Sequence, residues 1–151
     1  MSRWWTTGVI VALALPLAAC SSTQVTATTC IDWVWFDTPA DAAADADAVA
    51  IGHVIAEAEP ASYLGMTANR WSVDVDSWIS GAGPAEITVT SLPRSCGDEV
   101  DSFEHYGHGQ DVVLFLREDA KGWQALTPFQ GIAPAGPDGG IPSEWPDELS
   151  G

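Results

Sequence analysis

Basic residues are scarce in this chain. It holds 5 lysines and arginines against 21 aspartates and glutamates, and its formal net charge is −16 at pH 7. A protein that binds nucleic acid neutralises several phosphates with lysine and arginine, so this charge balance argues against nucleic acid as a partner. The same balance disfavours contact with anionic lipid head groups. It favours a soluble acidic surface or a cationic partner.

Signatures of common enzyme classes are also absent. The sequence has no G-x-S-x-G nucleophile turn, no glycine-rich phosphate loop and no H-E-x-x-H zinc helix. Histidine occurs only 3 times. We therefore expect no catalysis, no metal and no cofactor.

No apolar run near the N-terminus is long enough to span a bilayer, which takes about 20 residues. Arg3 precedes a shorter apolar run at residues 8–17, which Pro16 interrupts, and small residues follow it. A positive start, a short apolar middle and a small-residue exit are typical of a secretory signal. We assign residues 1–19 to this signal.

The signal ends at a cysteine. Residues 17–20, Leu-Ala-Ala-Cys, resemble a bacterial lipobox. The resemblance implies that Cys20 carries a diacylglyceryl group and becomes the first residue after cleavage. Because stable anchoring takes two or more acyl chains, this lipid would hold the protein on the extracytoplasmic face of the cell membrane. The alternative is a secreted protein in which Cys20 merely lies in the cleavage region. The Ser/Thr-rich residues 20–29 then form a flexible tether.

Cysteine is rare as well, with 3 residues in the chain. With Cys20 assigned to lipid, Cys30 and Cys96 remain, and an even pair in an exported protein favours a disulfide. The alternative is a catalytic thiol, which an oxidising compartment disfavours.

Helix signals follow Cys30. Thr38 can cap a helix, Pro39 suits its first turn, and Asp41 has the capping-box spacing. The alanines beyond favour a short helix that ends near Ala46. The aspartates of residues 41–47 also invite a calcium interpretation, but they lack the D-x-[DN]-x-[DN]-G order of a calcium loop. Favourable negative charge at a helix start explains Asp41 better.

From residue 48 onward the apolar period changes to two, which indicates strands. Five are predicted, at residues 48–56, 70–79, 86–92, 111–118 and 123–129. Gly52 marks a bulge or a close backbone approach, and the fourth strand, apolar on both faces, is expected to be buried. Residues 93–110 read as a long polar connection. Residues 134–151, rich in proline, glycine and acid, are expected to be disordered. These elements predict an all-β barrel or sandwich with one short helix.

The order of the pieces resembles a known type of domain. TPADAAADADAVAIGHV, RWSVDVDSWISG, EITVTS with SCG, GHGQDVVLFL and GWQALTPFQG follow one another as in the tissue-inhibitor-of-metalloproteinase family. The resemblance covers residues 30–131 and implies a five-stranded OB-type barrel, with the domain at residues 30–133. It also implies that a disulfide between Cys30 and Cys96 ties the N-terminal segment to the barrel.

The inhibitory chemistry of that family does not transfer readily. Animal inhibitors of this type chelate the protease zinc through the free amine and carbonyl of an N-terminal cysteine. Here the chain would begin at Cys20, whose amine is committed to the membrane end, and Cys30 is internal. Further family cysteines would fall near Ala44 and Phe129, and neither position is cysteine.

Histidines gather in the polar connection. Glu104, His105 and His108 stand close together in sequence, and two histidines three apart can share a metal with an oxygen ligand from Asp101 or Glu104. A solvated, turn-rich loop is the simpler interpretation. His53 lies in the first strand at an inward phase, which favours a hydrogen-bonded barrel histidine over a catalytic base.

Tryptophan is abundant, with 8 residues, and some can stack a ligand. Core filling explains Trp71 and Trp123 equally well. Trp78 shares the polar phase of its strand with Asp74 and Asp76, so we expect it to be an exposed anchor. We take Trp78, His105 and His108 as candidate ligand contacts.

These features predict a lipid-anchored, extracytoplasmic binding or structural protein of the bacterial cell envelope. Its partner would be an unknown envelope protein or a small ligand. Two alternatives stay open. One is a metalloprotease-inhibitor-like protein that uses a loop other than its N-terminus, and the other is a metal-dependent enzyme that uses His105 and His108.

Overall fold

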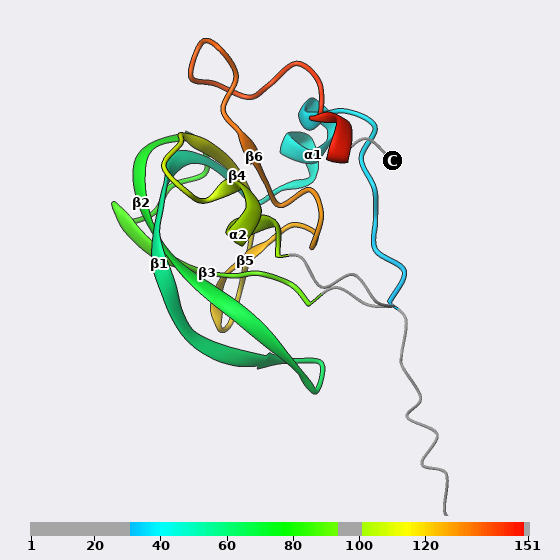
Figure 1. The fold of residues 1–151 in the computed structure, drawn as a ribbon, viewed down its shortest axis with the longest axis vertical. Coiled ribbons are helices and arrows are strands. Elements are labelled where there is room, and N and C mark those ends of the chain that lie inside the picture. The colour runs from blue at the N-terminus through cyan, green and yellow to red at the C-terminus, as the bar shows by residue number, and fades with distance from the viewer. Residues whose placement is uncertain (1–30, 94–100, 150–151) are drawn as a thin grey trace, which may run out of the picture.

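The computed structural model describes residues 31–93 and 101–149, and these residues are built around one β-sheet (Figure 1). The strands are β1 (Ala48–Tyr63), β2 (Met66–Ser80), β3 (Glu86–Thr90), β4 (Val112–Asp119), β5 (Gly122–Ala125) and β6 (Ile132–Pro134). Helix α1 (Pro39–Asp45) precedes the sheet, α2 (Ser102–Tyr106) lies between β3 and β4, and a 3₁₀ turn, η1 (Asp147–Leu149), follows β6. The all-β class is confirmed.

Helix α1 begins and ends where the sequence predicts. Thr38 has an extended backbone, its hydroxyl accepts a hydrogen bond from the amide of Asp41 at 3.2 Å, and it donates one to the Asp41 carboxylate at 2.7 Å. The helix ends at the C-cap Ala46. A capping threonine satisfies backbone donors that have no partner inside the helix.

Helix α2 is an addition to the prediction, which had one helix only. It occupies part of the expected polar connection, where Asp101 caps it by accepting a hydrogen bond from the amide of Phe103 at 2.9 Å. Phe103 and Tyr106 are buried, so this short helix is held by packing. None of the helices in the described ranges is long and apolar enough to cross a membrane.

The strands follow the order β1-β2-β3-β5-β4-β6, and β1 also pairs with β4. The β1–β2, β2–β3, β4–β5, β1–β4 and β4–β6 pairs are antiparallel, whereas β3 and β5 are parallel. Strands β1 and β2 form a long, curved hairpin whose far end projects from the rest of the molecule (Figure 1). The OB-type barrel stays a prediction.

Strand β4 lies at the centre of the core, as its apolar sequence predicts. Val112 to Leu116 are completely buried, because both faces of this stretch are covered. The alternating strands also behave as expected, since Trp71, Val73, Ile87 and Val89 are all buried. The β4–β5 turn falls at residues 119–122, between the predicted fourth and fifth strands.

Gly52 marks a close approach between two strands, which the sequence also predicts. A Cβ atom at this position would collide with the backbone carbonyl oxygen of Asp74 on β2. The β1–β2 register shifts between Ile51 and Gly52, so the glycine sits at an irregularity of the ladder.

The expectation of disorder beyond residue 133 is wrong for residues 134–149. Trp145 and Leu149 are 8% and 3% exposed, and the Trp145 ring meets Phe115 of β4 at 5.4 Å between ring centres. The Trp145 indole also donates a hydrogen bond to the carbonyl of Phe36 at 2.8 Å. Two large apolar side chains hold the segment in place, although its average composition is polar and rich in proline and glycine.

Gln130 joins this C-terminal segment to the N-terminal one. Its completely buried amide accepts a hydrogen bond from the Phe36 amide at 2.7 Å and donates to the Phe36 carbonyl at 3.0 Å. It also donates to the Leu149 carbonyl at 3.1 Å. The ordered domain therefore extends well past the predicted limit at residue 133.

Candidate functional site

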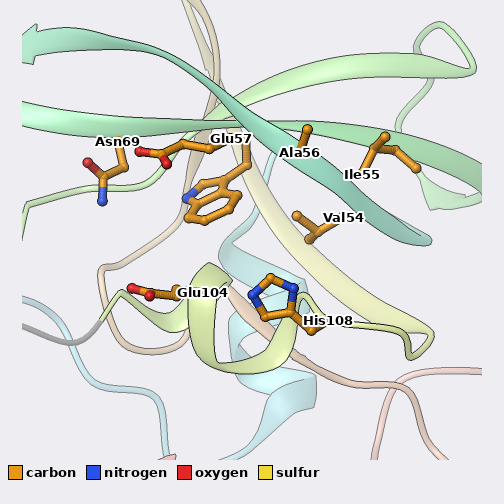
Figure 2. Close-up of a pocket in the computed structure, with 8 residues that line it drawn as sticks. Val54, Ile55, Ala56, Glu57, Asn69, Glu104 and His108 are labelled. Atoms are coloured by element: carbon orange, nitrogen blue, oxygen red, sulfur yellow. The ribbon is translucent and has the colours of Figure 1, made fainter.

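A cleft of about 310 Å³ lies between the β1–β2 hairpin and α2 (Figure 2). We call it the β1–α2 cleft. Residues 54–57 of β1 form one wall, Asn69 and Trp71 come from β2, and Glu104 and His108 come from α2 and the residues after it. Figure 2 shows Glu57 and Asn69 on the strand side, with Glu104 and His108 facing them from the helix side. The cleft thus combines apolar side chains with a few polar groups, as ligand sites do.

The charges in the cleft are mostly negative. Glu57 and Glu104 are both exposed and contribute a carboxylate from each wall, and the lining residues include no lysine or arginine. Trp71 lies deep, at 6% exposure. Carboxylates around an aromatic ring are the groups that attract an ammonium or guanidinium ion.

Asp101 holds the two sides of the cleft together. One carboxylate oxygen accepts hydrogen bonds from the Asn69 amide at 3.0 Å and the Trp71 indole at 3.1 Å, both on β2. The other accepts from the Ser91 hydroxyl at 2.8 Å and the Phe103 amide at 2.9 Å. This carboxylate links β2, the residue after β3 and the start of α2. The relative positions of the cleft walls therefore depend on it.

A glycine, Gly107, lets the C-terminal end of α2 pack closely against β1. A Cβ atom at Gly107 would collide with the carbonyl oxygen of Phe103 and would lie 2.9 Å from Cβ of Val54 on β1. Because glycine lacks that atom, the helix end lies directly against the β1 wall. A larger residue here would force the cleft walls apart.

The structure separates the two candidate histidines. His108 lines the cleft, whereas His105 is exposed elsewhere and packs edge-on against Tyr106 at 4.6 Å between ring centres. Within residues 31–93 and 101–149, no three histidine, cysteine, aspartate or glutamate side chains are grouped so that they could hold a metal ion. Only His108 and Glu104 of that cluster belong to the cleft.

Trp78 is not the exposed anchor expected from its phase. It is half-buried, packs against the core and lies 5.4 Å from Trp123 between ring centres. The cause is a bulge, because Ile51 pairs with Ser77 but Gly52 pairs with Val75, which leaves Asp76 unpaired. The extra residue moves Trp78 to the core side of β2.

His53 is also displaced from its expected phase. Its side chain is 47% exposed, not inward, and its two ring nitrogens lie 3.5 Å from Asp76 and 3.4 Å from Asp111. The expected phase of β1 is wrong, because His53 pairs with the exposed Asp74 of β2, whereas its neighbours Gly52 and Val54 pair with Val75 and Val73 on the core face.

Several predicted residues lie outside the described ranges. They are Cys20 with the signal and tether, and the two cysteines of the predicted disulfide, Cys30 and Cys96. Lipidation and disulfide pairing therefore stay predictions.

Sequence reasoning missed Glu57 and Asn69 as cleft residues. Neither belongs to a motif, and only the pairing of β1 with β2 and the bond from Asn69 to Asp101 bring them to the cleft.

Comparison with known proteins gives no relative. No model of a known protein family, no curated protein and no solved structure matches this chain.

Proposed function

We propose that this protein is a non-catalytic binding protein of the bacterial cell envelope, held at the extracytoplasmic face of the membrane by lipid on Cys20. The anchoring rests on the pattern of residues 1–20, where a short apolar signal ends in a lipobox-like Leu-Ala-Ala-Cys. The binding role rests on the β1–α2 cleft.

We further propose that the sheet is a partly open OB-type barrel, related to the tissue-inhibitor-of-metalloproteinase type. The support is the pairing pattern, in which β4 returns to β1, β3 and β5 are parallel, and α2 lies between β3 and β4. Inhibition of metalloproteases is not part of the proposal, because Cys30 is internal and the amine of Cys20 is assigned to the membrane end.

The ligand of the cleft is a small molecule or an envelope protein that presents a basic group. One observation carries this conclusion: Glu57 and Glu104 place carboxylates on opposite walls of a cleft that contains Trp71. A lysine or arginine side chain entering there would meet both carboxylates and the ring. The large negative charge of the chain would speed the encounter with a cationic partner.

Titration with a short lysine-containing peptide tests the site. The full-length protein, in detergent at low ionic strength, is titrated with the peptide and with the same peptide acetylated on its lysine. Binding is followed by tryptophan fluorescence and calorimetry. We expect a clear preference for the unmodified peptide, and at least a ten-fold loss of affinity in Glu57→Gln and in Glu104→Gln.

Glu59→Gln is the matched control, because Glu59 is an exposed acid of β1 that does not line the cleft. Its affinity should equal that of the wild type. Equal weakening by all three substitutions would show that net charge alone attracts the peptide, and the cleft would lose its role. Failure of the unmodified peptide to bind would also contradict the proposal.

The anchor has its own test. Cys20→Ala should move the protein from the membrane fraction to the soluble fraction of expressing bacteria, and labelled fatty acid should no longer be incorporated. Unchanged partitioning of the variant would contradict lipid anchoring.

A further inference from the structure

A second hollow, of about 130 Å³, lies on another part of the sheet, and its charge is opposite to that of the cleft. It lies between the end of β1, the first third of β2 and the β4–β5 turn. Arg70 and Lys121 both line it. They are 51 positions apart in the sequence, and the fold brings them to one place.

Neither cation is neutralised within the described ranges. Among the described residues, Arg117 forms an ion pair with Asp45. No ion pair within these ranges involves Arg70 or Lys121. At the hollow the two cations face one carboxylate, Asp119, so positive charge is in excess and an anion is favoured.

The remaining lining groups set the kind of anion. Asp119 also lines the hollow, with one oxygen accepting a hydrogen bond from the Lys121 amide at 2.7 Å. With two cations and one carboxylate, the lining residues carry a formal charge of +1 (2 − 1), which a monoanion balances and a dianion exceeds. The planar guanidinium of Arg70 matches the two oxygens of a carboxylate. Trp123 and Gln124 add apolar surface and hydrogen-bonding groups for the atoms next to the anion.

We infer that this hollow binds the carboxylate end of a ligand, with Arg70 and Lys121 as its charge partners. A volume of about 130 Å³ is well above the roughly 10–15 Å³ that one water needs, so a carboxylate and the atoms attached to it fit there. The carboxylate belongs either to an acidic sugar or to the C-terminus of a peptide. This inference is independent of the β1–α2 cleft, because the two share no lining residue.

Matched ligand pairs test the inference and identify the source. The full-length protein is titrated by calorimetry and by NMR with glucuronate against glucose, and with N-acetylalanine against its amide. Glucose 6-phosphate is the dianion of comparable size. We expect one carboxylate to bind at least ten times more tightly than its neutral counterpart and more tightly than glucose 6-phosphate.

Variants then assign the binding to the hollow. Arg70→Gln and Lys121→Gln should each weaken the preferred carboxylate about ten-fold, and Arg70→Lys should recover part of the loss because it restores charge without the planar fork. Arg117→Gln makes the same charge change outside the hollow, so it should leave the affinity unchanged. Thermal melts confirm that each variant is folded.

Two sets of results would overturn the inference. In the first, no carboxylate binds at millimolar concentration, or the phosphate binds as tightly as the best carboxylate. In the second, Arg117→Gln weakens binding as much as Arg70→Gln does. Neither result would contradict the proposed ligand of the β1–α2 cleft, because the peptide titration of that cleft uses other variants and a probe of opposite charge.

Discussion

Asp101→Ala should destabilise the protein by about 3 kcal/mol, because one carboxylate serves four donors. Loss of the N-cap of α2 costs about 1 kcal/mol. The Trp71 indole, in a residue that is only 6% exposed, would lose its partner at a cost of about 1–3 kcal/mol. Asn69 and Ser91 contribute less, because water partly replaces the bond at Asn69 and contributions within one network are not additive.

Urea unfolding followed by tryptophan fluorescence measures this loss. With a slope of about 2 kcal/mol per molar urea, the midpoint should fall by about 1.5 M. The midpoint of Asp101→Asn should lie between those of the wild type and Asp101→Ala. Asparagine is a good cap and keeps one acceptor oxygen, but its NH₂ group replaces the oxygen that faces Trp71. Asp37→Ala, at an exposed aspartate, is the control and should leave the midpoint unchanged.

A loss below about 1 kcal/mol for Asp101→Ala, or one equal to that of Asp37→Ala, would refute the idea that Asp101 joins β2 to α2. A slope that changes together with the midpoint would indicate partial unfolding of α2 and not a uniform loss of stability.

Three further outcomes are expected from the same unfolding assay. Trp145→Ala should cost about 3–5 kcal/mol, because it removes a buried aromatic ring and its bond to Phe36, and a loss near zero would mean that the C-terminal segment is not packed in solution. Gly52→Ala should cost about 1–3 kcal/mol through the clash with the Asp74 carbonyl, whereas Gly65→Ala, in an open turn with positive φ, tests backbone strain without a clash. Replacing both cysteines of the predicted disulfide by serine should cost about 4 kcal/mol in non-reducing buffer and nothing in reducing buffer; equal midpoints in both buffers for the wild type would argue against the bond.

Local signals in the sequence were sufficient for much of the fold. The cap at Thr38 and Asp41 needs only four consecutive residues, and the alternation around Ile87 and Val89 needs only one strand, so both predictions are confirmed. The buried β4 followed from its unbroken apolar run. In each case the sequence neighbours alone determine the outcome.

Features that depend on a distant partner were predicted wrongly. Trp78 changed faces because Asp76 forms a bulge in β2, and an alternating pattern in one strand carries no information about a bulge. His53 faces outward because the even positions of β1 around it, and not the odd ones, pair with the core residues of β2, which the sequence of β1 alone does not show. Trp145 lies in a segment of disordered composition, and its partner Phe36 is 109 positions away. Composition averages over such a segment and hides its few apolar contacts.

The sequence indicated one wall of the β1–α2 cleft and not the other. Glu104 and His108 belong to the cluster of candidate metal ligands identified in the sequence, and both line the cleft. The opposite wall could not be foreseen, because Glu57 is an ordinary exposed acid of a long strand. Its role depends on where α2 is placed, and Asp101 sets that through contacts with β2.

The attachment of Phe36 has a mechanical consequence. Its amide and carbonyl are held by Gln130 and its carbonyl also by Trp145, so both ends of the described chain meet at this residue. Under the proposed anchoring, and with the predicted disulfide of Cys30 reduced, a pull from the membrane would reach these three bonds before it reached the sheet. They would have to rupture together, so the domain should resist extension from its tethered end. Proteolytic removal of the last residues of the chain would remove some of these hydrogen bonds and let force unfold the domain from the membrane side.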